Sequence, residues 1–300
     1  MSQLRLIITN EIKTDISSKS FWIATFVVPL ILGLFGVFAG TMMADSSFGS
    51  ASAEMQPHPD YENITPLKTL GMLLGIFPVL FLMIYGSMIF NKVKTEKCNR
   101  IVEILATCVE GKTMMLAKII AVGVVGLIQL TLWFVLGALV VGMMLLLLGQ
   151  SFPFHVFSNF DYWLAFIWAV AFFIGGYIFY GSLFAAIGAM TDKNNENQSY
   201  VAVLTFILLA SFYIGEYAVD NATSGFVYAC SFIPFTSSTV LTVISASKEA
   251  PLWLSLSGLA ALYVFAFLTL SLSGKIYTSS LLLKGKKFMP KDIITFLKSK

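Results

Sequence analysis

The fold of this chain is decided by an uncharged run from Ile119 to Leu148, IIAVGVVGLIQLTLWFVLGALVVGMMLLLL. A helix needs about 20 apolar residues to cross the hydrocarbon core of a bilayer, and this run is long enough. The chain is 57% hydrophobic and only 12% charged, against about 25% charged residues in a typical soluble domain. We therefore predict that it is a membrane protein.

Five other stretches are also long and apolar enough to span a bilayer. Together they predict six transmembrane segments: Phe21 to Met43, Leu67 to Phe90, Ile119 to Leu148, Asp161 to Ala189, Tyr200 to Tyr217 and Pro251 to Ser273. The stretches are continuously apolar and do not alternate, which indicates helices rather than a β-barrel. The predicted fold class is an all-α polytopic membrane protein, with a six-span domain over residues 21–273.

The basic residues give the orientation of these spans. Of the 19 Lys and Arg residues, 17 lie in four segments, residues 1–20, 91–118, 190–198 and 274–300, whereas Lys68 and Lys248 lie elsewhere. Cytoplasmic loops of membrane proteins carry an excess of Lys and Arg. We therefore predict that both termini and two internal loops are cytoplasmic, and that residues 44–66, 149–160 and 218–250 lie outside.

The stretch from Phe226 to Ser247 is apolar enough to suggest a seventh span. It contains Pro234 and several Ser and Thr residues, and a seventh crossing would place the basic C-terminus outside. We therefore interpret residues 226–247 as a re-entrant or interfacial pair of short helices. Irregular backbone at this depth is tolerated only where protein or a water-lined cavity surrounds it.

Two cytoplasmic segments have helical periodicity. In the first, residues 1–20, the pattern predicts an amphipathic helix from Gln3 to Ile16, with Arg5, Glu11, Lys13 and Asp15 facing away from its apolar side. A plain juxtamembrane lead-in fits this pattern equally well.

In the second, residues 92–116, apolar and charged stripes predict one long amphipathic helix. The charged stripe mixes both signs, which suits docking against a protein, although a solvated helix is the simpler interpretation. The tail, residues 274–300, is basic and suits anionic lipid headgroups.

Catalytic motifs are not evident. Residues 106–113 read ATCVEGKT, a near match to a phosphate-binding loop, but Ala106 replaces the first glycine and no strand precedes the motif. The two histidines are far apart and have no metal-ligand spacing. Within the spans, Gln129 and Glu216 are weak candidates for a substrate path, and ion-coupled carriers normally have more intramembrane carboxylates. The chain thus predicts a transporter without its own nucleotide site, metal or cofactor, so that a partner supplies the energy.

Four stretches carry a resemblance to a known family. They are Lys19-Ser20-Phe21-Trp22 leading to Pro29; Glu96-Lys97-Cys98-Asn99-Arg100-Ile101-Val102-Glu103-Ile104-Leu105 followed by Gly111 and Lys118; Gly181 to Gln198; and Ile233-Pro234-Phe235-Thr236-Ser237 with Lys275-Ile276-Tyr277 and Gly285-Lys286-Lys287. The chain resembles the permease subunits of type-two ABC exporters, most closely the NatB-like sodium-extrusion sub-family. The second stretch is the specific one, and it is similar to that family's E-K-x-x-R-x-x-E-[IVL]-L signature. The chain departs from the family at Ser238, Cys108 and Val109.

The resemblance implies a transport role and partners. Two permease subunits would pair, as a homodimer or a heterodimer, and bind ABC ATPase subunits, which hold ATP and Mg. Residues 1–20 would be an elbow helix, 92–116 a coupling helix and 226–247 an outer re-entrant segment. The residues implied in ATPase coupling are Glu96, Lys97, Arg100, Glu103 and Ile104, and those implied at an outer gate are Pro234, Phe235 and Thr236.

The remaining expectations concern the cellular location of the protein and its substrate. The resemblance implies the bacterial cytoplasmic (inner) membrane and contacts with lipid but not with nucleic acid. The sub-family suggests sodium export, whereas a path poor in carboxylates suits an amphipathic organic molecule or a lipid. The alternative functions are a secondary carrier and an integral membrane enzyme with no ATPase partner.

Overall fold

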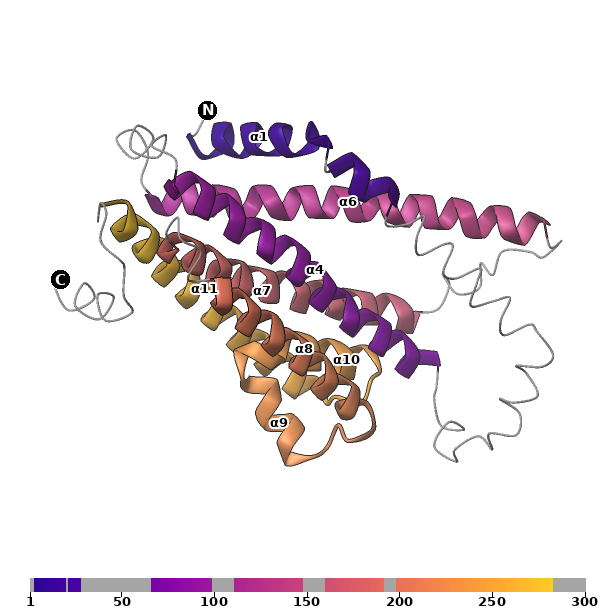
Figure 1. The fold of residues 1–300 in the computed structure, drawn as a ribbon. Helices are drawn as coiled ribbons and strands as arrows, with labels where there is room; N and C mark the ends of the chain where they lie inside the picture. Colours follow the sequence, from indigo (N-terminus) through magenta and orange to yellow (C-terminus); the bar gives the residue numbers. More distant parts are fainter. Residues whose placement is uncertain are drawn as a thin grey trace.

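The computed structural model describes residues 3–19, 21–27, 66–98, 111–147, 160–191 and 198–282. Within these ranges the chain is helical and has no strand. The helices, labelled as in Figure 1, are α1 (Gln3–Ile16), α4 (Pro66–Cys98), α6 (Gly111–Leu147), α7 (Phe160–Met190), α8 (Gln198–Asp220), α9 (Gly225–Phe232), α10 (Pro234–Ala246) and α11 (Leu252–Leu282). Residues 21–27 are also helical.

Five of these helices, α4, α6, α7, α8 and α11, are long and apolar enough to cross a membrane. They confirm a multi-pass, all-helical protein over the described residues and coincide with five of the six predicted spans. Most of the first predicted span, Phe21 to Met43, lies outside those residues. Several helices extend beyond the predicted spans: α4 continues to Cys98, α6 already begins at Gly111 and α11 continues to Leu282.

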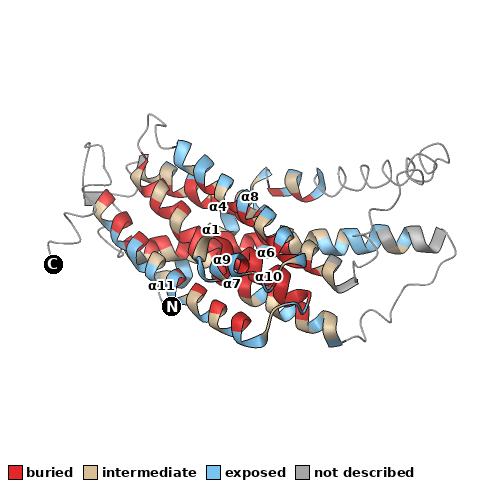
Figure 2. Ribbon diagram, turned by 90° about the horizontal axis from the view of Figure 1, so that it is seen from below, coloured by how far each residue is buried: buried red, intermediate tan, exposed pale blue. Residues whose placement is uncertain are grey.

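Large apolar side chains cover much of the outer surface of the bundle. Phe134 on α6, Phe206 on α8 and Phe267 on α11 are all more than half exposed. Figure 2 shows that exposed residues follow the outer helix faces, while buried ones gather between α4, α7 and α10. Exposed apolar surface on this scale requires an apolar solvent, and a surrounding bilayer supplies it.

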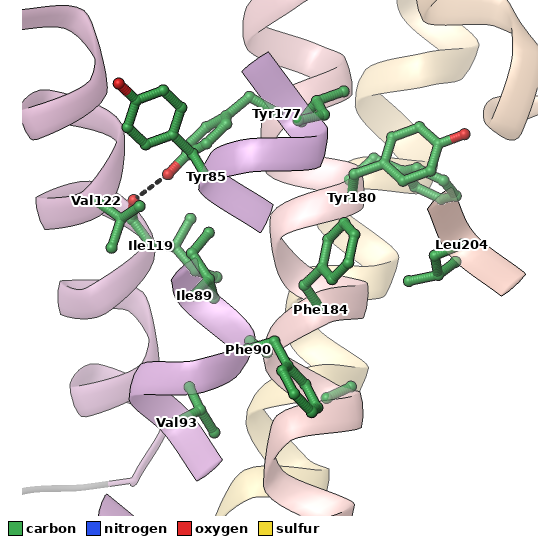
Figure 3. Close-up of a cluster of buried hydrophobic side chains, with 14 of the residues drawn as sticks. Tyr85, Ile89, Phe90, Val93, Ile119, Val122, Tyr177, Tyr180, Phe184 and Leu204 are labelled. Atoms are coloured by element: carbon green, nitrogen blue, oxygen red, sulfur yellow. Dashed lines mark hydrogen bonds between the residues drawn. The ribbon is translucent and has the colours of Figure 1, made fainter. Parts of the chain in front are cut away.

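The main core lies between α4, α6 and α7 and is rich in aromatic rings. The ring of Phe81 on α4 lies 4.8 Å from that of Phe173 on α7, in an edge-to-face arrangement. Tyr177 donates a hydrogen bond of 2.6 Å from its hydroxyl to the carbonyl oxygen of Ile119 on α6, as Figure 3 shows. Because Tyr177 is buried, this bond also satisfies a hydroxyl that water cannot reach.

The helix α10 is enclosed by the others. Every residue from Thr236 to Ala246 is buried, although many of them are Ser or Thr. Close approach depends on small neighbours: a Cβ atom added at Gly71 would lie 2.8 Å from the carbonyl oxygen of Val243, and one added at Gly176 would lie 2.7 Å from the Cβ atom of Ser238. Glycine therefore permits α4 and α7 to pack directly against α10.

The two lysines outside the four basic segments are both paired with acids. Lys68 lies 3.5 Å from Asp220 and 3.6 Å from Glu249, and Lys248 contacts Asp161. Lys68 stands in the first turn of α4, near the opposite end of that helix from Cys98. Because Lys and Arg are expected mainly on the cytoplasmic side, few lysines are expected at this end of the bundle. Nearby carboxylates neutralise the two that are present.

Candidate functional site

The residues that the sequence implies in coupling lie at and beyond the end of α4. Glu96 and Lys97 belong to the last turn of α4, which ends at Cys98. Arg100, Glu103 and Ile104 lie outside the described residues, so a single coupling helix over residues 92–116 stays a prediction. The described parts of that range belong to the ends of α4 and α6.

Glu96 is one end of a row of five charged side chains that joins three helices, which we call the charge chain. In order, its members are Asp15, Lys92, Glu11, Lys118 and Glu96. The Nζ atom of Lys92 lies 2.6 Å from Oδ2 of Asp15 and 2.6 Å from Oε2 of Glu11. The Nζ atom of Lys118 lies 3.1 Å from Oε1 of Glu11 and also contacts Oε1 of Glu96. Each lysine therefore bridges two carboxylates, and Glu11 is shared by both.

The charge chain is largely shielded from solvent. The side chain of Lys118 is 2% exposed and that of Asp15 is 9% exposed. A buried ion is costly unless it is paired and hydrogen-bonded, which explains why each lysine has two partners. With all groups ionised, three carboxylates face two ammonium groups, so the charge chain carries one net negative charge.

The two acids of α1 respond differently to this environment. Burial alone would raise the pKa of Glu11, but Lys118 and Lys92 outweigh burial and hold the pKa below its ordinary value. Burial raises the pKa of Asp15 above its ordinary value, because Lys92 only partly offsets it. Folding therefore favours the charged carboxylate of Glu11, whereas it disfavours the charged carboxylate of Asp15.

The inward position of these acids differs from the prediction that they face away from the apolar side of the first helix. The packed face of α1 consists of Leu4, Ile7, Ile8, Glu11, Ile12 and Asp15. These positions follow the i, i+3, i+4, i+7, i+8, i+11 spacing of one helix face. The acids continue the apolar stripe, and that spacing was the signal that could have found them. Sequence reasoning missed Lys92 and Lys118 altogether as their partners.

A fourth helix, α11, borders the charge chain through Tyr277. This side chain is 1% exposed, and its hydroxyl is within electrostatic reach of the carboxylate of Glu96. Among the described residues, neither the hydroxyl nor Oε2 of Glu96 has a partner at ordinary hydrogen-bond distance. A Cβ atom added at Gly111, the first residue of α6, would lie 2.8 Å from the side-chain oxygen of Thr278. The start of α6 is thus packed tightly on α11.

An open groove of about 510 Å³ runs beside the charge chain along α4. Its described lining residues are Ile84, Ser87, Met88, Asn91, Lys92, Thr95 and Glu96. They recur at helical spacing, so one face of α4 forms this side of the groove. The face is largely apolar near Ile84 and Met88 and polar toward Glu96, an arrangement that matches an amphipathic molecule.

The residues implied at an outer gate lie together where α10 begins. Pro234 is in the first turn of α10, where a missing N–H has no cost. The carbonyl oxygen of Phe235 accepts a 2.6 Å hydrogen bond from Tyr180, and Thr236 donates one of 2.6 Å to the carbonyl oxygen of Cys230. These contacts fix the junction of α9 and α10; its place relative to the membrane stays a prediction.

The two weak path candidates are far from equivalent. Gln129 on α6 is 6% exposed, and its Oε1 atom accepts a 2.9 Å hydrogen bond from the hydroxyl of Tyr85. Such a bond between helices suits packing within a membrane. Glu216 lies on α8, partly buried, one turn before the helix ends. Over the described ranges, no three His, Cys, Asp or Glu side chains gather as a metal site would need.

Comparison with known proteins identifies a protein family that matches most of this chain. The family model described as ABC-2 family transporter protein matches residues 43–275. The chain is 28% identical over 228 residues to "Uncharacterized protein YhaP" of Bacillus subtilis (strain 168), covering 73% of this chain and 53% of that protein. It is 24% identical over 212 residues to "Uncharacterized protein MJ1024" of Methanocaldococcus jannaschii, covering 71% and 49%. The chain thus spans about half the length of these curated relatives. No solved structure matches it.

Proposed function

The chain belongs to the ABC-2 family of transporter proteins, and on that premise we propose that it is the permease subunit of an ATP-driven exporter. The observation that carries the mechanism is the charge chain. It ties together the end of α4 and the start of α6, which flank residues 99–110, where most of the specific sequence signature, Glu96 to Leu105, lies. A force applied to this segment by a partner would reach both transmembrane helices at once.

The partner in this proposal is an ABC ATPase subunit that binds ATP and Mg. Residues 92–116 form the coupling segment, with Lys97, Arg100, Glu103 and Ile104 facing the ATPase. Glu96 has a different part, because its Oε1 atom contacts the buried Lys118. We assign it to anchoring the segment within the permease. Mixed charges on the exposed side would give the contact its specificity.

The rest of the assembly follows the same proposal. α1 is the elbow helix, residues 226–247 form the outer re-entrant segment, and six spans are completed by residues 21–43. Two permease subunits pair in the bacterial inner membrane, with both termini in the cytoplasm. Closure of the ATPase dimer on ATP shifts the coupling segments and opens the path to the outside.

For the substrate, the proposal favours an amphipathic organic molecule or a lipid over sodium. The groove on α4 supports this choice, since its described lining changes from apolar to polar along one helix face. Such a lining would hold a chain and a headgroup together.

The proposal is tested with the tagged protein in membrane vesicles that contain its ATPase partner. An amphiphilic fluorescent probe should accumulate on the outer side when ATP is added, and charge reversal of Arg100 and Glu103 together should abolish the accumulation. Transport that survives ATP depletion and follows a sodium or proton gradient would instead indicate a secondary carrier. Turnover of a membrane substrate without any ATPase would indicate an integral membrane enzyme.

A further inference from the structure

The charge chain is built from helices that contribute opposite charges. Both acids of α1, Glu11 and Asp15, point to lysines that come from other helices. Lys92 comes from α4 and Lys118 from α6. Separation of α1 would remove both carboxylates that contact Lys92 and one of the two that contact Lys118. The attachment of α1 to the bundle is therefore electrostatic as well as apolar.

Lys118 differs from the other four members of the charge chain in its contacts. It contacts Glu11 on α1 and Glu96 on α4 while belonging to α6, so three helices meet at one ammonium group. Its side chain is 2% exposed, so water cannot replace a lost carboxylate. An uncompensated buried charge is much more costly than a broken pair at the surface.

We propose that the charge chain clamps α1 onto α4 and α6, with Lys118 as the positioning residue. The three helices then move as one rigid unit, and two of them, α4 and α6, flank residues 99–110 in the sequence. The clamp itself depends only on the contacts of this chain. Its role in transmitting motion rests on the proposed function. The two parts can therefore fail separately.

The clamp is tested by limited trypsin digestion of the full chain in mild detergent. Arg5 and Lys13 lie on exposed positions of α1, and cleavage after either residue requires local opening of the helix. In the variant Lys118→Met we expect cleavage in α1 to become at least about tenfold faster than in the wild type. The variant Glu11→Gln, at a less buried position, should show an increase in the same direction.

Two further variants distinguish loss of the charge at Lys118 from a general disturbance of the fold. Lys275→Met removes an exposed lysine on α11 and should leave the cleavage rate unchanged. Lys118→Arg keeps the positive charge and should restore most of the protection. Wild-type protection in both Lys118→Met and Glu11→Gln would overturn the proposal, as would a Lys118→Arg variant that is as sensitive as Lys118→Met.

The transmitting role needs the complex with its ATPase. ATP hydrolysis by the complex should fall in Lys118→Met and recover in Lys118→Arg, in parallel with protection of α1. Loss of protection with unchanged hydrolysis would confine the clamp to a structural role and overturn its part in transmission. If no ATPase accompanies the wild type, the proposed function fails, while the digestion still decides whether the clamp exists.

Discussion

Gly188 on α7 is a position where one methyl group should separate two helices. A Cβ atom there would lie 2.8 Å from the carbonyl oxygen of Phe90 and 3.1 Å from the Cβ atom of Val93, both on α4. Ordinary contact begins at 3.4 Å, and a backbone carbonyl cannot rotate away as a flexible side chain can. Overpacking of this kind costs about 1–3 kcal/mol.

The substitution Gly188→Ala also changes helix propensity, and a matched control removes that effect. Alanine is favoured over glycine in a helix by about 1 kcal/mol. Gly137 on α6 is exposed, and none of the described residues lies within 4 Å of its added Cβ atom, so Gly137→Ala receives the propensity gain alone. We therefore expect Gly188→Ala to be less stable than Gly137→Ala by about 1–3 kcal/mol.

The assay is reversible unfolding of both variants in mixed detergent micelles containing increasing SDS, followed by circular dichroism. The free energies of unfolding are compared under identical conditions. Equal stability of the two variants would refute the close packing of α7 on α4, because no clash would then separate them. A Gly188→Ala variant more stable than the control would refute it equally.

Three other predictions concern single contacts. Tyr180→Phe removes the hydrogen bond to Phe235 and should lower the free energy of unfolding in the same assay by about 0.5–1.5 kcal/mol, whereas Tyr213→Phe at an exposed position should not change it. Because the pKa of Glu11 is lowered on folding, its stabilising effect is complete above the ordinary value of 4.5 and is lost as pH falls through the lower folded value; Glu11→Gln should remove this loss from the pH profile of the unfolding free energy in the same assay. Lys248 has a φ angle of 60°, so Lys248→Ile should cost about 1–2 kcal/mol of unfolding free energy while Lys248→Gly should cost less.

The transmembrane helices were predictable because the bilayer imposes a length and an apolar composition on each one. The ends of those helices were harder to predict. Met114 and Met115 are buried in α6 although they precede the predicted span at Ile119. The one charged residue between them and the span, Lys118, suggests a loop only until its partners are known. Pairing lets a helix carry a buried lysine next to a membrane.

The charge chain could not be predicted, since its members are distant in sequence. Lys92 and Asp15 are 77 positions apart, and Lys118 and Glu11 are 107 apart. Local periodicity shows which face a residue occupies, but it does not show which helix will cover that face. The acids of α1 illustrate this limit: Glu11 and Asp15 share the spacing of the packed face, yet only the position of α4 and α6 gives them a reason to be there.

The central claim is that this chain is the permease of an ATP-driven exporter, coupled through residues 92–116. It is tested most directly by affinity purification of the tagged chain in mild detergent, with identification of the proteins that accompany it. The account predicts an ABC ATPase subunit that is released by charge reversal at Arg100 and Glu103 and retained when the exposed Lys275 is reversed. A preparation that contains no ATPase, even after gentle crosslinking in the membrane, would contradict it.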